Sequence, residues 1–261
     1  MPLAPGGSWV RVGDQSLEYR FWGADTQDAP TLVMLHEGLG SVGLWRDFPG
    51  QLAKATGLGV MAYSRAGYGA SDAIPLPRPL DYMTREAQYV LTKVLSDLGI
   101  ERPILLGHSD GATIAALYAA IFDVRGVILI APHFFTEPAG LSEITRAREQ
   151  FEDGDLRARL SRHHADPDCA FRGWNDAWLD PGFRDWNVTG SLDDITAPVL
   201  AIQGGDDPYG TIAHVEEVER RASAPVEVLL LPGCGHAPHM EAPHIVLPAI
   251  AAFVDRVGDP S

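Results

Sequence analysis

The chain has 261 residues, of which 46% are hydrophobic and 21% are charged, so it holds enough apolar material for one large α/β domain or two small ones. Its 20 basic and 35 acidic residues give a formal net charge of −15, which argues against a nucleic-acid or anionic-membrane surface and favours a small-molecule partner. No stretch approaches about 18 consecutive apolar residues, residues 1–7 lack a signal-peptide pattern, and two cysteines give no disulfide framework, so we expect a cytoplasmic protein with reduced thiols.

Short apolar runs alternate with helical patterns over most of the chain. The runs predict strands at residues 8–12, 16–22, 31–35, 59–63, 103–106, 126–131, 198–203 and 226–231. The helical patterns predict helices near residues 45–56, 84–98, 112–121, 212–222 and 243–257. Because most of the strands are continuously apolar, we predict an α/β fold, a mostly parallel, doubly wound sheet of about eight strands covered on both faces. The first two strands, joined by a hairpin at Gly13 and Asp14 and followed by a polar linker at 25–30, should add an antiparallel edge.

The alternation stops between the sixth and seventh predicted strands. Residues 132–195 are richer in Arg, His, Trp and Asp, and they show helical patterns near 142–151 and 156–164. Since open α/β sheets bind ligands beyond the carboxyl ends of their strands, we expect this segment to form a helical cap over that edge. The predicted division is a core domain of residues 1–131 and 196–261 and a cap insertion of residues 132–195.

A serine stands at the apex of a predicted strand–turn–helix unit. Residues 107–111 read Gly-His-Ser-Asp-Gly, between the strand at 103–106 and the helix at 112–121. A strained turn brings backbone against backbone, which explains the glycines two places either side of Ser109. This geometry exposes the hydroxyl at a helix N-terminus, where free N–H groups can meet a developing negative charge. The pattern favours a nucleophile, although in isolation a flexible Gly/Ser loop would read the same way.

A serine hydroxyl needs a base to take its proton, and the base needs an acid to orient it. His236 lies in a glycine-rich loop after the last predicted strand, and Asp206 and Asp207 follow the strand before it. Loops at the carboxyl ends of neighbouring parallel strands meet at one edge of the sheet. The order serine, acid, histidine at three strand exits therefore predicts a catalytic triad of Ser109, an aspartate and His236.

These residues and their order resemble the α/β-hydrolase family over essentially the whole chain, in the group of capped esterases, lactonases and meta-cleavage-product hydrolases. The resemblance implies the α/β-hydrolase fold, no cofactor, and an acid at the fourth place of the Gly-Gly-Asp-Asp stretch at 204–207, which is Asp207. Asp206 is its rival, with capping of the next helix as its other role, and Asp194 is a weaker alternative. Epoxide hydrolases and haloalkane dehalogenases of this fold carry a carboxylate at the nucleophile position, so Ser109 argues against both.

An oxyanion hole needs two preorganised N–H donors. The resemblance implies that one is the amide of Asp110 and that the other comes from the turn after the third strand, where this chain reads His36-Glu37-Gly38. Gly38 holds the donor position, but Glu37 replaces the glycine that the family usually has there. Gly38 and Leu39 therefore both stay open as the second donor, and Glu37 is either a surface carboxylate of the loop or part of the pocket.

The carboxylate of Asp110 beside the nucleophile could disfavour an anionic intermediate if it pointed into the site. We expect it to point away and to hydrogen-bond to the loop at Ser64 and Arg65 or to the Glu37 turn. The alternative is that it orients a polar group of the substrate. Arg65 is interpreted as an intramolecular tether.

The cap contributes aromatic and arginine side chains. We expect Trp174, Trp178 and Trp186 to form an apolar lid, and Trp174 and Trp178, with Glu37 and Leu39, to contact substrate. The cap also holds five arginines, any of which could bind a substrate carboxylate: Arg146, Arg148, Arg157, Arg159 and Arg162. We expect at least four of the five to be solvated or paired with acids on helix surfaces.

Other polar residues near these motifs are expected to be structural. The run at 163–169 offers His, Asp and Cys side chains, but its adjacent histidines diverge, so we predict no metal site. His239 and His244 should lie at the surface or behind His236, Cys234 should be a small buried residue, and Trp45 should belong to the core.

The sequence thus predicts a cofactor-free serine hydrolase that cleaves a carboxylic ester or lactone of a small to medium molecule through an acyl-enzyme. A carbon–carbon bond hydrolase of the meta-cleavage-product type would use the same triad, and a cap arginine reaching the site would favour it. Haloperoxidase-like behaviour also shares the triad. A ligand-binding receptor or pseudo-enzyme on this fold is the alternative from another class. The sequence does not indicate the oligomeric state.

Overall fold

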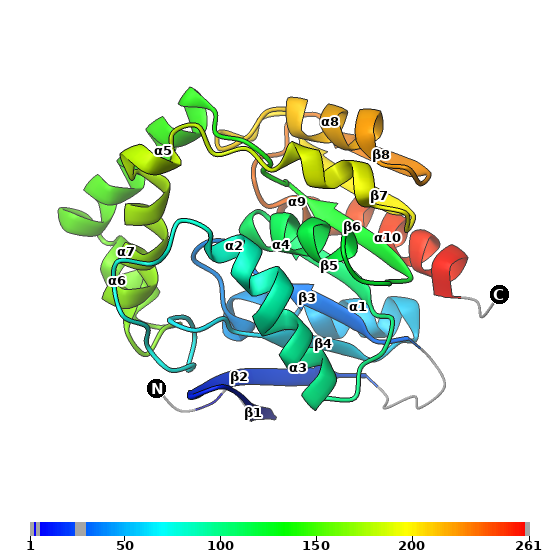
Figure 1. Ribbon diagram of the computed structural model, residues 1–261, viewed down its shortest axis with the longest axis horizontal. Helices are drawn as coiled ribbons and strands as arrows, with labels where there is room; N and C mark the ends of the chain where they lie inside the picture. Colours follow the sequence, from blue (N-terminus) through cyan, green and yellow to red (C-terminus); the bar gives the residue numbers. More distant parts are fainter. Residues whose placement is uncertain (1–2, 4–5, 24–29, 259–261) are drawn as a thin grey trace.

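The strands form one sheet, in which they lie in the order β1-β2-β4-β3-β5-β6-β7-β8 (Figure 1). The computed structural model describes residues 3, 6–23 and 30–258, so most of the linker predicted at 25–30 lies outside the described residues. The strands are β1 (Gly7–Val12), β2 (Gln15–Trp22), β3 (Leu32–Leu35), β4 (Val60–Tyr63), β5 (Ile104–His108), β6 (Gly126–Ile130), β7 (Val199–Gly204) and β8 (Val226–Leu231).

Helices connect these strands. They are η1 (Val42–Trp45), α1 (Phe48–Thr56), α2 (Tyr82–Arg85), η2 (Glu86–Val90), α3 (Leu91–Asp97), α4 (Asp110–Ala119), α5 (Pro138–Glu152), α6 (Leu156–Leu160), α7 (Pro167–Trp178), η3 (Pro181–Phe183), η4 (Thr189–Asp194), α8 (Ala213–Arg221), α9 (Pro238–Glu241) and α10 (Pro243–Gly258).

The pairing of the strands confirms the predicted mostly parallel sheet. β1 pairs antiparallel with β2 and β2 pairs antiparallel with β4, while the pairs from β4 through β3, β5, β6 and β7 to β8 are all parallel. The hairpin of β1 and β2 therefore forms the antiparallel edge that the sequence predicts. Because the other strands run the same way, their carboxyl ends lie together at one edge of the sheet.

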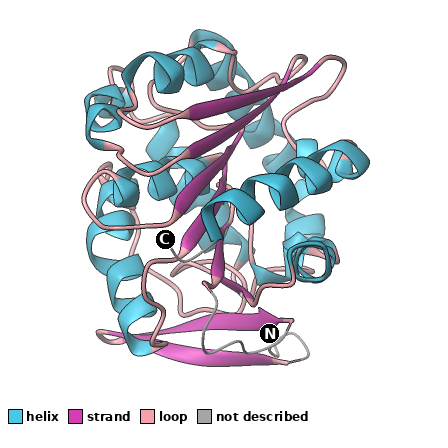
Figure 2. Ribbon diagram, turned by 90° about the vertical axis from the view of Figure 1, so that its right-hand side faces the viewer, coloured by secondary structure: helices cyan, strands magenta, loops and turns pink. Residues whose placement is uncertain are grey.

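Helices cover both faces of the sheet, which explains why the central strands are apolar throughout (Figure 2). Neighbouring residues of β3 point to opposite faces, so Leu32 packs with α1 and α10 while Val33 packs with α3 and α4. Every residue of β3, β4, β5, β6 and β7 is buried, whereas β8 at the far edge is only partly buried. Two hydrophobic cores, one on each side of the sheet, result from this alternation.

Two predicted helices are interrupted in the structure. The helix predicted at 45–56 is a 3₁₀ turn, η1, followed by α1, with a break at Arg46, whose φ is +52°. The helix predicted at 84–98 begins as α2, continues through the π-helical η2 and ends as α3. Hydrophobic periodicity indicates that such a segment is helical, but it does not distinguish the wider π turn from an α turn.

The segment between β6 and β7 holds α5, α6 and α7, which lie to one side of the sheet in Figure 1. α7 was not predicted, although its start carries clear signals. Pro167 follows Asp166, whose side chain accepts a hydrogen bond of 2.9 Å from the Cys169 amide. The assignment of residues 132–195 to a separate cap domain stays a prediction. Within the described ranges, no helix combines the length and apolar character needed to cross a membrane.

Candidate active site

Ser109 occupies a strained turn between β5 and α4. Its φ of +54° and ψ of −119° are unusual for a residue with a side chain. The flanking glycines allow the turn, because a Cβ on Gly107 would lie 2.1 Å from the Gly111 carbonyl oxygen, and one on Gly111 would lie 2.0 Å from that of Leu35. The Ser109 amide donates to the Ile130 carbonyl at 2.9 Å and ties the turn to β6. The chain has therefore adopted the sharp turn that the glycine spacing predicts.

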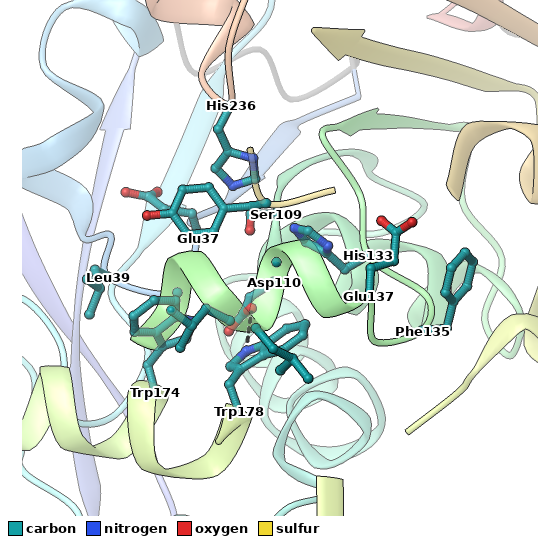
Figure 3. A pocket seen from close by; sticks show the side chains of 15 residues that line it. Glu37, Leu39, Ser109, Asp110, His133, Phe135, Glu137, Trp174, Trp178 and His236 are labelled. Atoms are coloured by element: carbon teal, nitrogen blue, oxygen red, sulfur yellow. Dashed lines mark hydrogen bonds between the residues drawn. The ribbon is translucent and has the colours of Figure 1, made fainter. Parts of the chain in front are cut away.

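A cavity of about 120 Å³ opens above Ser109 (Figure 3). It brings together most of the predicted site residues. The lining residues are Glu37, Gly38, Leu39, Ser109, Asp110, His133, Phe135, Glu137, Gly140, Leu141, Ile144, Trp174, Trp178, Tyr209 and His236. Such a cavity is smaller than the clefts of about 300–1,000 Å³ that bury drug-sized ligands, so it suits a small substrate group.

His236 is oriented by Asp207, which lies behind it and outside the cavity lining. The two are joined by a hydrogen bond of 2.8 Å between His236 Nδ1 and Asp207 Oδ2. A carboxylate can only accept, so Nδ1 carries the proton and Nε2 is left as the basic nitrogen. Burial acts to raise the pKa of Asp207, but the hydrogen bond and charge of His236, with the Tyr209 amide at 2.8 Å, outweigh it and lower that pKa. Asp207 is thus held as an anion beside the imidazole.

Asp206 and Asp194, the two alternatives to Asp207 as the acid that orients His236, do not contact this histidine. Asp206 is exposed, and its amide donates to the Cys234 carbonyl at 2.9 Å. The helix-capping role that was its alternative is wrong, because Ile212 stands at the N-cap of α8. Asp194 is exposed at the end of η4. Of the three aspartates considered, Asp207 alone contacts His236 within the described residues.

The turn after β3 is held from below by Arg65 and presents its amides to the cavity. The Arg65 amide donates to His36 Nε2 at 3.1 Å, and Arg65 Nη2 donates to the Glu37 carbonyl at 3.0 Å. This confirms the predicted tether. The amides of Gly38, Leu39 and Asp110 donate to no acceptor in the described part of the chain. All three residues line the cavity, so the choice between Gly38 and Leu39 as oxyanion donor stays open.

The carboxylate of Asp110 points away from the cavity centre and into the cap side of the site (Figure 3). It accepts hydrogen bonds from the Tyr82 hydroxyl and, at 3.3 Å, from Trp178 Nε1, and Arg65 Nη2 lies 4.0 Å away. The carboxylate thus points away as expected, and Arg65 of the expected loop lies at ion-pair distance. The expected hydrogen bonds to Ser64 or the Glu37 turn are wrong, because Tyr82 and Trp178 are the donors. Burial raises the pKa of Asp110, and the three neighbours oppose that rise.

Glu37 is part of the pocket, and its interpretation as a surface carboxylate is wrong. Its side chain is 29% exposed, lines the cavity and places Oε2 3.6 Å from His108 Nδ1. Burial acts to raise the pKa of Glu37, but the contact with His108 and the charge of that imidazole outweigh it and lower the pKa. Gly40 makes room for this carboxylate, since a Cβ there would lie 2.3 Å from Oε2.

Two of the three cap tryptophans reach the cavity as predicted. Trp174 packs its indole against Gly38, Trp178 bonds to Asp110, and Trp186 stacks on Phe183 without lining the cavity. No arginine lines the cavity in the described part of the chain. Four of the predicted cap arginines instead pair with acids on the helices, as expected: Arg146 with Glu143, Arg148 with Asp176, Arg157 with Asp168 and Arg159 with Asp155.

Several site residues were missed by the sequence reasoning. His133 follows β6, lines the cavity and has its ring centroid 5.6 Å from that of His236. Glu137 also lines it and accepts from the Thr211 amide at 2.8 Å, while Gln203 donates to Asp207 at 3.0 Å. His133 could have been found, because it stands at a strand exit like the residues that were identified.

The remaining candidates are structural. Among the residues that the structure describes, no group of His, Cys, Asp or Glu side chains is arranged to hold a metal ion. His164 instead bridges the Gly69 amide and the Leu39 carbonyl, at 3.0 Å each, and supports the turn after β3. Trp45 and Cys234 are buried in the core as predicted, His239 is buried beside the His108 ring, and His244 is exposed.

Comparison with known proteins gives consistent matches along the chain. A model of the alpha/beta hydrolase family matches residues 32–249. A proline iminopeptidase of Lactobacillus helveticus (strain DPC 4571) is 24% identical over 282 residues, covering 91% of this chain and 94% of that protein. A hydrolase from Pseudomonas aeruginosa PA01 has a similar structure, with a TM-score of 0.75, 19% identity and coverage of 96% of this chain and 99% of that one. The enol-lactonase from Burkholderia xenovorans LB400 is also similar, with a TM-score of 0.73, 18% identity and coverage of 95% and 100%. At these identities the structural likenesses show the fold alone, and they confirm the predicted one.

Proposed function

Since the chain belongs to the alpha/beta hydrolase family, we propose that it is a serine hydrolase that cleaves a carboxylic ester or lactone of a small to medium molecule. Ser109 is the nucleophile, His236 the general base and Asp207 the residue that orients His236. The partner is a small molecule that enters the cavity above Ser109. Residues 132–195 would act as the cap over a core of residues 1–131 and 196–261, in a cytoplasmic protein.

The proposed reaction begins when His236 Nε2 takes the proton of the Ser109 hydroxyl and the Ser109 oxygen attacks the carbonyl carbon. The carbonyl oxygen becomes an oxyanion, which accepts hydrogen bonds from the Asp110 amide and from the amide of Gly38 or Leu39. His236 then gives its proton to the leaving alcohol, and an acyl-enzyme forms on Ser109. A water molecule, activated by His236, releases the acid and restores the serine.

The observation that carries this proposal is the hydrogen bond between His236 and Asp207. The hydrogen bond of 2.8 Å to Asp207 uses Nδ1, and it leaves Nε2 as the acceptor in a side chain that lines the same cavity as Ser109. The strained turn at Ser109 supports the proposal independently, because such backbone conformations persist where function requires them. The amides of Gly38, Leu39 and Asp110, which donate to no acceptor among the described residues, belong to residues that line the same cavity, and they support the proposal as candidate oxyanion donors.

The direct test is Ser109→Ala in the purified protein, with hydrolysis of short aryl esters and a lactone as the readout. We expect hydrolysis to be abolished, and unchanged hydrolysis would refute the assignment. A fluorophosphonate probe separates this proposal from the ligand-binding alternative. A working nucleophile is labelled in the wild type and not in Ser109→Ala, whereas a pseudo-enzyme is labelled in neither.

A second candidate is hydrolysis of an ester or amide that carries a positive charge near the scissile bond. The cavity lining includes the carboxylates of Glu37 and Glu137, while that of Asp110 is turned to Tyr82 and Trp178, and no lysine or arginine lines the cavity in the described ranges. The name of the Lactobacillus helveticus relative, proline iminopeptidase, is in keeping with such a substrate. Matched p-nitrophenyl esters with a neutral or an ammonium-bearing acyl group test it, and a preference for the neutral ester would contradict it.

The same absence of a lining arginine counts against carbon–carbon bond hydrolysis of an anionic diketone acid. Such a substrate would need a cation for its carboxylate, and it would meet Glu37 and Glu137 instead. Hydrolysis of a meta-cleavage product, followed by its visible absorbance, is expected to be at least about 100-fold slower than ester hydrolysis, which is roughly 2.7 kcal/mol in the barrier.

A further inference from the structure

We infer that Glu37 and His108 form a second acid–histidine pair, which positions the catalytic base by holding the main chain of His236. The inference rests on the proposed function, because it assigns His236 as the base. His108 and Glu37 would be positioning residues, since neither is required to touch the reacting atoms. Asp207 holds the ring of His236, and His108 holds its backbone.

His108 makes the contact to the base loop. It is the last residue of β5, directly before Ser109, and its Nε2 lies 2.7 Å from the His236 carbonyl oxygen. A carbonyl oxygen only accepts, so the proton of this bond belongs to His108 Nε2. The side chain is 5% exposed, and its ring centroid is 5.0 Å from that of His236. His108 thus contacts the loop of the base, and the residue next to it in the chain, Ser109, is the proposed nucleophile.

The other ring nitrogen of His108 faces Glu37. His108 Nδ1 is buried and has no hydrogen-bond partner among the described residues, and the nearest acceptor is Glu37 Oε2 at 3.6 Å. At 3.6 Å the two groups are within ion-pair distance but beyond the length of a hydrogen bond, so Glu37 faces the edge of the ring that His108 does not use for His236. The Glu37 backbone is itself held, because its carbonyl accepts from His36 Nδ1 at 2.7 Å and from Arg65 at 3.0 Å.

The groups that face the His108 ring support this assignment. Besides Glu37, they are the imidazoles of His236 and His239, with ring centroids at 5.0 and 4.7 Å, and the indole of Trp45 at 6.4 Å. Burial, with the charges of His108 and His236 acting the same way, lowers the pKa of His239 to about 3, and the charge of Glu37 opposes this. Of these groups, Glu37 is the carboxylate that faces the His108 ring.

This pair joins three loops that the reaction needs at once. Glu37 belongs to the turn that offers the oxyanion amides, His108 to the turn of the nucleophile, and His236 to the loop after β8. A shift of about 1 Å in a catalytic group can cost on the order of 100-fold in rate. Glu241 holds the amides of Gly235 and Ala237 on either side of His236, at 2.7 and 3.0 Å. Without the bond to His108, the loop keeps these contacts and the ring contact to Asp207, but the carbonyl of His236 itself loses its anchor.

The experiment compares His108→Ala, His108→Gln and the exposed control His244→Gln in the full chain, by kcat and KM on an aryl ester. We expect His108→Ala to lower kcat by about 10–100-fold with KM changed by less than about threefold. His108→Gln keeps an N–H donor and should recover at least part of that loss, and His244→Gln should match the wild type. Glu37→Gln should lower kcat less than His108→Ala does, and the double variant should be no slower than His108→Ala alone.

A second background separates positioning of the base from general damage to the fold. In His236→Ala, adding His108→Ala should leave the residual hydrolysis unchanged, because the anchored group is already absent. An equal loss in both backgrounds, or no recovery in His108→Gln, overturns the inference. If Ser109→Ala abolishes hydrolysis while His108→Ala keeps kcat within about twofold, the inference alone fails; if Ser109→Ala retains hydrolysis, the proposed function fails first.

Discussion

Trp178 donates a hydrogen bond of 3.3 Å from Nε1 to Oδ1 of Asp110, and this bond joins α7 to the first residue of the helix behind the nucleophile. The same indole lies 3.1 Å from the Tyr82 hydroxyl, which also bonds to Asp110. The carboxylate of Asp110 therefore contacts three buried side chains, those of Tyr82, Trp178 and Arg65, and does not point at a substrate. Trp174 and Trp178, both of α7, line the cavity (Figure 3).

Trp178→Phe tests this contact. The variant keeps an aromatic ring but removes the donor to a buried carboxylate, which typically costs about 1–3 kcal/mol of unfolding free energy. Urea unfolding at pH 7 measures it. Trp186→Phe is the matched control, because Trp186 stacks on Phe183 and does not line the cavity. Equal losses in the two variants would mean that the hydrogen bond to Asp110 contributes nothing specific.

Asp207→Asn tests the orientation of His236. An amide side chain can donate as well as accept, so it no longer requires the proton on His236 Nδ1. We expect kcat to fall by about 10³–10⁴-fold with little change in KM. Asp206→Asn removes a carboxylate from the adjacent, exposed position and should keep kcat within about twofold of the wild type. If Asp206→Asn is the inactive variant, the rival acid is the catalytic one.

The lowered pKa of Asp207 predicts how stability depends on pH. A carboxyl group whose pKa is lower in the folded state than in the unfolded state stabilises the fold above its unfolded pKa of about 3.9, and this contribution is lost as the pH falls through the folded value. The difference in unfolding free energy between wild type and Asp207→Asn should therefore be largest near pH 7 and shrink below about pH 4. Urea unfolding at several pH values between 7 and 3 measures it. A difference that grows toward low pH would contradict the cited direction.

The sheet and the loops that carry Ser109, Asp207 and His236 were predictable because their signals are local. β3, β5 and β7 are short apolar runs, and each ends in a turn whose glycines and polar residues stand next to it in the sequence. Ser109, Asp207 and His236 could be proposed as one site because the carboxyl ends of parallel strands meet at one edge. His133 satisfies the same rule after β6, so it could have been identified as well.

The environment of Asp110 was not predictable in this way. Its partners Tyr82 and Trp178 lie 28 and 68 residues away in the sequence, and neither stands at a strand exit. The position of Glu37 has the same origin, because the contact with His108 depends on how two loops pack. Local sequence patterns predict which loops lie together. Which side chains contact one another within those loops depends on the packing of the folded chain, and local patterns do not show it.

Gly38→Ala tests how closely Trp174 covers the turn with the oxyanion amides. A Cβ on Gly38 would lie 2.2 Å from Trp174 Nε1 and 2.3 Å from its Cδ1, so either the turn or the indole must move. Overpacking of this kind typically costs about 1–3 kcal/mol, and we expect a lower melting temperature and a fall in kcat/KM of about 10–100-fold.

A double variant tests whether the ring of Trp174 causes this loss. Trp174→Ala removes the clashing ring, so adding Gly38→Ala to Trp174→Ala should lower kcat/KM less than Gly38→Ala does in the wild type. Gly190→Ala is the matched control, because Gly190 is exposed, an added Cβ would meet no atom within 4 Å, and its φ is not positive. Strictly additive losses in the double variant would show that the indole of Trp174 does not constrain the turn.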